Sequence, residues 1–127
     1  MQIAEFYHRV LIVNVTHSVR EGRSVYDATR FAWSLNPLRA ENAEIILARC
    51  GHEIIAAFVA FRWIDATREN FPDLWDQLDG MPVVGRYPKD RYGFEGCEAD
   101  DDIRNLYVGK RVPDKYIGQN PIRYIKC

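Results

Sequence analysis

The sequence lacks the features that mark membrane proteins, secreted proteins and small metal-bound proteins. Its apolar runs are far shorter than the roughly 18 residues that a membrane-spanning helix needs. The first ten residues, MQIAEFYHRV, contain no basic region followed by an apolar one, so we expect no signal peptide. Cys50, Cys97 and Cys127 are scattered and odd in number, which argues against a disulfide framework or a zinc cluster. We therefore expect free thiols in a cytoplasmic protein that does not enter a membrane.

The chain also lacks a surplus of charge and the common catalytic motifs. Its 17 basic and 18 acidic residues give a net charge of −1, so any basic surface that attracts nucleic acid must be local. It contains no glycine-rich phosphate loop, no G-x-S-x-G and no H-E-x-x-H. His8, His17 and His52 have no metal-ligand spacing. We expect no metal ion and no cofactor, and we favour a binding protein over an enzyme.

Turn and cap signals divide the 127 residues, which we treat as one domain, into strands that alternate with helices. Strands are predicted over 10–16, 44–50, 53–64, 91–99 and 120–125, with a further short one at Val83-Val84. Helices are predicted over 24–35, 38–43, 66–78 and 100–108. Gly51-His52 joins the second and third strands in the clearest hairpin. The fold class is therefore α+β, with a curled mixed sheet or open β-barrel and helices packed outside.

The first candidate site lies at the junction of the first strand and helix, where His17, Ser18, Arg20 and Arg23 precede the Ser24 helix cap. On a helix that runs to Leu35, Tyr26, Arg30 and Trp33 share one face at i, i+4 and i+7. The core face of that helix carries Val25, Ala28, Ala32 and Leu35. The remaining face either packs under another element or offers a stacking surface to a flat ligand.

Three further places pair cations with aromatic rings or polar groups. Arg62 and Trp63 end the second hairpin strand. Within YGFEG, Tyr92 and Phe94 share one face of a strand, and Glu95 on the other accepts a hydrogen bond from a base or pairs with an arginine. The basic tail interleaves lysines and arginines with tyrosines, and there Asn120 and Arg123 are candidates for holding a ligand.

The order of these motifs resembles a family of small prokaryotic and phage domains found beside GIY-YIG-type nucleases and defence genes. This resemblance rests on the stretches VREGRSVYDATRFAW, NPLRAENAEIILARCGHEIIAAFVAFRW, RYGFEG, IRNLYVGKRVPDKY and NPIRYI. The arrangement is also similar to the PUA-like group, which includes ASCH, EVE and SRA domains that bind RNA, DNA or modified bases. That resemblance implies a pocket near Trp33, Trp63 and Phe94 with Ser18, Arg20 and Arg30 at its mouth. Nuclease activity is not implied, because YVGK and YIGQ are only short echoes of the nuclease motif.

Three functions remain open. The first is a non-catalytic module that binds a nucleotide or nucleic acid through an aromatic pocket with arginines. The second is a phage or mobile-element protein that sequesters a signalling nucleotide or blocks a defence or nuclease protein. The third is a nucleotide- or RNA-cleaving hydrolase that uses His17, Glu95 and Arg20. The predicted ligand-binding residues are Ser18, Arg20, Arg23, Tyr26, Arg30, Trp33, Arg62, Trp63, Phe94, Glu95, Asn120 and Arg123.

Overall fold

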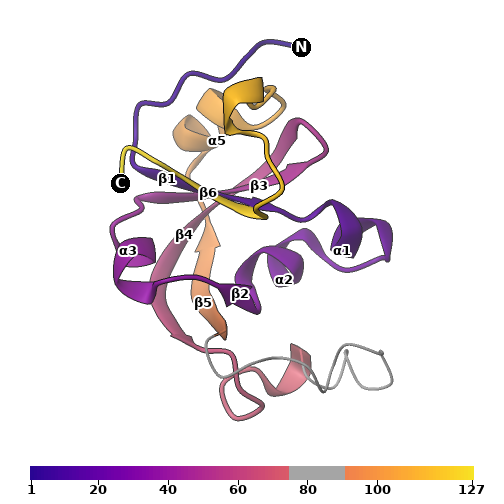
Figure 1. Ribbon diagram of the computed structural model, residues 1–127, viewed down its shortest axis with the longest axis vertical. Helices are drawn as coiled ribbons and strands as arrows, with labels where there is room; N and C mark the ends of the chain where they lie inside the picture. Colours follow the sequence, from indigo (N-terminus) through magenta and orange to yellow (C-terminus); the bar gives the residue numbers. More distant parts are fainter. Residues whose placement is uncertain (75–90) are drawn as a thin grey trace.

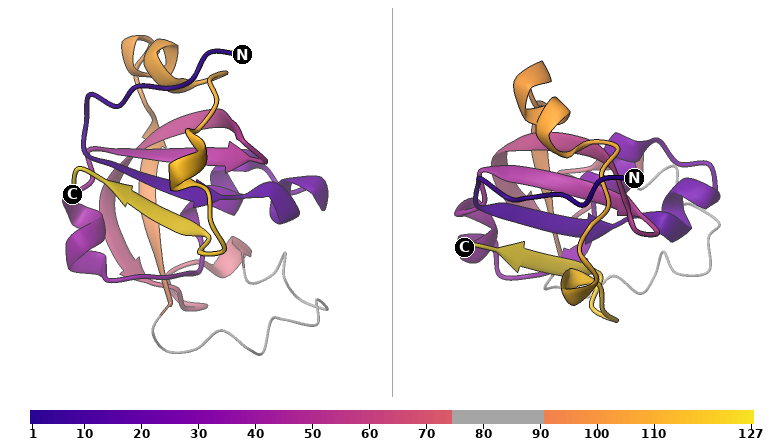
Figure 2. Two further views of the ribbon diagram at one scale, coloured as in Figure 1. Left: turned by 45° about the horizontal axis from the view of Figure 1, so that its top comes forward. Right: turned by 90° about the horizontal axis from the view of Figure 1, so that it is seen from above.

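Six strands form one mixed sheet that is nearly closed into a barrel (Figures 1 and 2). The computed structural model describes residues 1–74 and 91–127. The strands are β1 (Val10–Asn14), β2 (Trp33–Ser34), β3 (Ile45–Cys50), β4 (Glu53–Asp65), β5 (Arg91–Glu98) and β6 (Ile122–Ile125). Their order across the sheet is β2-β5-β4-β3-β1-β6, with β1 and β3 parallel and all other neighbours antiparallel. The predicted fold class, α+β with a curled mixed sheet, is confirmed.

Short helices cover the sheet on both sides. They are α1 (Thr16–Arg20), α2 (Val25–Arg30), α3 (Pro37–Glu41), α5 (Asp101–Tyr107) and the 3₁₀ turn η2 (Asp114–Tyr116). Figure 1 shows α5 and the N-terminal segment on one side of the sheet and the first three helices on the other. Among the described residues, none of these helices is long and apolar enough to cross a membrane.

The central strands are buried on both faces, as β1 illustrates. Val10 and Ile12 belong to the core cluster under α5 and η2, whereas Leu11 and Val13 belong to the cluster under α2 and α3. Successive side chains of a strand point to opposite faces, so a strand between two cores is apolar throughout. This explains why VLIV shows no alternation of apolar and polar residues.

Most predicted elements are confirmed to within a few residues. The hairpin of β3 and β4 turns at Gly51, whose φ of +60° suits glycine. The α3 helix begins at Pro37, and the side-chain oxygen of Asn36 accepts the Leu38 N–H at 3.0 Å. Of the helix predicted over 66–78, residues 68–70 form a turn and 72–74 are helical. Residues 75–78 and the strand predicted at Val83-Val84 lie outside the described residues.

The predicted helix over 24–35 is wrong in its second half. Ser24 caps it as expected, since its hydroxyl accepts the Asp27 N–H at 3.2 Å, but the helix ends at Arg30. Ala32 then adopts a φ of +71°, and Trp33-Ser34 form β2, which pairs with β5. Trp33 therefore does not continue the helical face of Tyr26 and Arg30. The short α1 helix lies where the sequence predicts the end of the first strand and the loop after it.

Candidate functional site

Two of the three aromatic residues expected to line a pocket, Trp63 and Phe94, contact each other in the core. Phe94 is fully buried and Trp63 is 8% exposed, and their ring centroids lie 5.1 Å apart. The Tyr26 ring lies 6.3 Å from Phe94 and 5.4 Å from Phe58. These rings therefore pack beneath α2.

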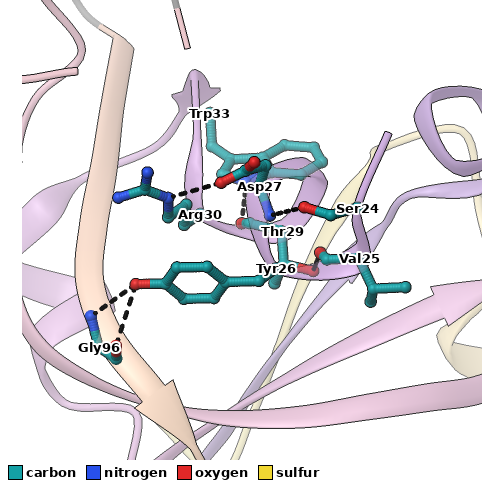
Figure 3. A network of polar contacts seen from close by, with 8 residues as sticks. All are labelled: Ser24, Val25, Tyr26, Asp27, Thr29, Arg30, Trp33 and Gly96. Carbon is teal, nitrogen blue, oxygen red and sulfur yellow. Dashed lines mark hydrogen bonds and ion pairs between the residues drawn. The ribbon is translucent and has the colours of Figure 1, made fainter. Parts of the chain in front are cut away.

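The polar groups around α2 hydrogen bond mainly within the protein (Figure 3). The Tyr26 hydroxyl donates to the Gly96 carbonyl at 3.0 Å and accepts the Gly96 N–H at 3.2 Å. The indole N–H of Trp33 donates to the Thr29 carbonyl at 2.6 Å. Arg30 lies over the Tyr26 ring and donates to Asp27 at 3.2 Å. The Tyr26 hydroxyl therefore attaches α2 to β5, whereas the other contacts lie within α2 or join it to β2.

The other predicted residues outside the tail are distributed over two separate places. Ser18 and Arg20 lie on α1, and Arg23 follows that helix. Arg62 and Glu95 face each other across β4 and β5, and the arginine Nε donates to the carboxylate at 2.9 Å. This hydrogen bond is the largest of the effects that lower the pKa of Glu95. The fold does not gather these residues around the buried aromatic rings.

A cavity of about 440 Å³ brings two predicted residues, Asn120 and Arg123, together with residues that were not predicted. We call it the α3–β6 cavity. It is lined by Asn36, Arg39, Tyr116, Gly118, Asn120, Ile122, Arg123 and Tyr124. Its walls come from α3, from β6 and from the loop before β6. In the order of the sheet, β2 and β6 are the two edges, and the segment from β2 to α3 runs alongside β6 (Figure 2). The cavity thus lies where the barrel does not close.

Two arginines of this cavity are held against tyrosine rings. The guanidinium carbon of Arg39 lies 4.2 Å from the Tyr124 ring centroid, and that of Arg123 lies 5.5 Å from the Tyr116 centroid. Arg39 also donates to the Cys127 carbonyl at 3.3 Å. Within the described ranges, neither arginine has an aspartate or glutamate side chain at ion-pair distance. No acidic side chain of the described residues therefore neutralises either charge.

The amides of the cavity are oriented by their own backbone. The Asn36 oxygen accepts the Leu38 N–H, and the Asn120 oxygen accepts the Ile122 N–H at 3.1 Å. Each side chain thus keeps its two amide hydrogens for another acceptor. The Tyr124 hydroxyl is buried without a hydrogen-bond partner among the described residues, and burial raises its pKa. Since no lining residue is a carboxylate, the cavity offers hydrogen-bond donors and positive charge, which suits an anion.

A second cavity, of about 450 Å³, lies between α2 and the β4–β5 pair. Val25, Ile55, Ala56 and Phe58 make much of its lining apolar, and Tyr26 is its single predicted ligand residue. It contains no cation. We therefore assign the candidate site to the α3–β6 cavity.

Sequence reasoning found Asn120 and Arg123 but missed Asn36 and Arg39. The stretch NPLR carried a usable signal, because a capping asparagine and a proline fix the helix start that positions the following arginine. Within the described part of the chain, no group of three or more histidine, cysteine or acidic residues is placed to hold a metal ion. In comparisons with known proteins, no family model, no curated protein and no solved structure matches this chain.

Proposed function

We propose that this domain is a non-catalytic binding module that recognises a nucleotide or nucleic acid through its phosphate in the α3–β6 cavity. The observation that carries the proposal is the pair Arg39 and Arg123, which line one cavity and have no ion pair with an aspartate or glutamate among the described residues. Arginine forms strong, charge-assisted hydrogen bonds with phosphate oxygens. The tyrosine rings hold the two guanidinium groups in place and reduce the entropy lost on binding.

The size and remaining lining of the cavity support a nucleotide as the ligand. A volume of about 440 Å³ falls in the range of small-molecule sites, roughly 300–1,000 Å³. Ile122 supplies an apolar part of the wall for a sugar or base. A net charge of −1 also favours a small ligand over a duplex, because duplex binding depends on neutralising many phosphates.

The same lining favours binding over catalysis. None of its side chains is a histidine, a carboxylate or a thiol, which are the usual general bases. The residues considered for a hydrolase are engaged elsewhere, since His17 lies 3.0 Å from Glu21 and Glu95 accepts from Arg62. A nucleotide held in such a cavity would stay intact, as a protein that sequesters a signalling nucleotide requires.

Kinship with the PUA-like group is part of the proposal. Its support is the mixed sheet that is nearly closed into a barrel, with the candidate cavity at the opening. Cys50, Cys97 and Cys127 are all free, which accords with the reducing cytoplasm in which a nucleotide ligand would be met.

Replacement of the two arginines tests the proposed function. We expect Arg39→Ala and Arg123→Ala each to weaken nucleotide binding by about tenfold or more, because a hydrogen bond to a charged group contributes about 1.5–3 kcal/mol. Isothermal titration calorimetry against nucleoside monophosphates and short oligonucleotides, at low and high salt, measures the effect. A steep loss of affinity with salt would identify a polynucleotide as the ligand.

The matched control is Arg104→Ala on α5. Arg104 is also a partly exposed arginine, but it forms ion pairs with Glu98 and Asp101 away from the cavity. The Arg104→Ala variant should bind nucleotides as tightly as the unmodified protein does. The proposal fails if no member of the panel binds at high micromolar concentration, or if all three variants bind equally well.

A further inference from the structure

We infer that the α3–β6 cavity selects a terminal phosphate monoester over an internal phosphodiester. This selectivity rests on the proposed function, since it specifies which phosphate of a nucleotide the cavity holds. Three features of the lining support it: two cations from different elements, two amides whose oxygens already accept a backbone N–H and whose NH₂ groups can donate, and the open backbone edge of β6.

The two cations approach the cavity from separate parts of the fold. Arg39 belongs to α3 and Arg123 to β6, and each is held against its own tyrosine. Because each guanidinium already lies against a ring of the cavity, these rings are partly covered and offer less surface for stacking a base. Recognition should therefore depend mostly on charge and hydrogen bonds to the anion.

The strand register adds a backbone donor to this set. The Asn14 N–H donates to the Pro121 carbonyl at 2.8 Å, so these two residues form a hydrogen-bonded pair of β1 and β6. Such pairs alternate along antiparallel strands, so Arg123 points its backbone groups to β1, whereas Ile122 and Tyr124 point theirs to the open edge. The Ile122 N–H is taken by Asn120, which leaves the Tyr124 N–H at the edge beside the cavity.

The donors present match a monoester better than a diester. A phosphate monoester carries a charge of about −1.5 to −2 at neutral pH and three free oxygens. A phosphodiester carries a single negative charge and two free oxygens. A diester would leave part of the donor set unused and one arginine not neutralised. The donor set consists of the two guanidinium groups, the amides of Asn36 and Asn120, and the Tyr124 N–H.

The protonation of the ligand gives an independent readout. The second pKa of a phosphate monoester is about 6, so it loses one charge near that pH. The charged side chains that face the cavity from α3 and β6 are Arg39 and Arg123, and no histidine, carboxylate or thiol lines it. A change in affinity near this pH would therefore come from the ligand.

Calorimetry with the intact protein tests the selectivity. The ligands are nucleoside 5′-monophosphates, the 3′,5′-cyclic monophosphates of the same nucleosides, the free nucleosides and inorganic phosphate. We expect the 5′-monophosphate to bind about tenfold or more tightly than the cyclic form, since the loss of one charge-assisted bond costs at least that much. Its affinity should fall between about pH 7 and 5 while that of the cyclic form stays constant. Arg123→Ala should remove most of the difference, and Arg104→Ala should not.

The outcomes separate the selectivity from the function. Equal binding of the 5′-monophosphate and the cyclic form, weakened by Arg123→Ala, would overturn the selectivity and leave the proposed function standing. If inorganic phosphate binds as tightly as the nucleotide, the preference for a phosphate dianion would be supported, but a nucleotide would be overturned as the ligand. If none of the four ligand classes binds, both ideas fail.

Discussion

The two glycines of RYGFEG show that a glycine in a strand can indicate either open space or close packing. Both Gly93 and Gly96 allow close packing in the fold. A Cβ atom on Gly93 would lie 2.5 Å from the Arg30 carbonyl oxygen, and one on Gly96 would lie 2.0 Å from that of Val59. Glycine marks a missing side chain, and only the fold decides whether solvent or a neighbouring chain fills the space.

Gly96→Ala should therefore destabilise the fold. The contact is with backbone at the register shift between Ala60 and Arg62, so β4 or β5 must move, at a cost of about 1–3 kcal/mol. Urea unfolding followed by circular dichroism measures the free energy of unfolding. Gly118→Ala is the control, because a Cβ atom there meets nothing within 4 Å, and it should change stability by less than about 0.5 kcal/mol. Equal stability of the two variants would refute the packing role of Gly96.

Among the elements, α2 shows where local pattern and tertiary pairing compete. Its start followed from Ser24, a side chain that acts within one turn. Its end did not, because Phe31, Ala32 and Leu35 keep helical spacing although the chain turns at Ala32 to pair Trp33 with Tyr92. That pairing joins residues 59 positions apart, which no local pattern encodes. The hairpin of β3 and β4 was predictable because its partners are adjacent in sequence.

The attachment of α2 to the sheet should depend on one hydroxyl group. Tyr26→Phe removes the partner of both the N–H and the carbonyl of Gly96, and we expect it to lower the free energy of unfolding by about 1–3 kcal/mol. Tyr7→Phe is the matched control, since that exposed hydroxyl donates only to Glu5 at the surface. Chemical denaturation of both variants checks the difference, and equal losses would contradict the role of Tyr26.

For the whole molecule, composition and element types gave the fold class, while the candidate site was only half predictable. Asn120 and Arg123 were found because the basic tail is a local feature of the sequence. Arg39 reaches the same cavity from a helix about 80 positions earlier. The sequence left the strand order open, and that order makes β2 and β6 the two edges of the sheet, with the cavity lying between β6 and α3, the helix that follows β2.

The pH dependence of stability is also a property of the whole chain. A hydrogen bond from Arg62 lowers the pKa of Glu95 below its ordinary value of 4.5. A hydrogen bond from Arg111 likewise lowers the pKa of Asp114 below its ordinary value of 3.8. The folded state then binds fewer protons than the unfolded chain, so this stabilisation is complete above about pH 5 and is lost as the pH falls through the lowered values. In urea unfolding from about pH 6 to 2, the double variant Glu95→Gln, Asp114→Asn should lose stability less steeply than the unmodified protein.

The control for this titration is Glu41→Gln, an exposed carboxyl on α3 with no ion pair among the described residues. It should keep the acid slope of the unmodified protein. Identical slopes in the double variant and the control would show that the two ion pairs do not persist in solution.

The unclosed edge of the barrel also bears on how the molecule moves. β6 is tied to the sheet through β1 alone, so its separation from β1 is among the least costly local openings of the fold. A phosphate held by Arg39 and Arg123 would bridge α3 to β6 and act as a link between the two ends of the sheet. Opening would then require release of the ligand, so occupancy would slow the fraying of β6 and raise the stability of the whole chain by mass action.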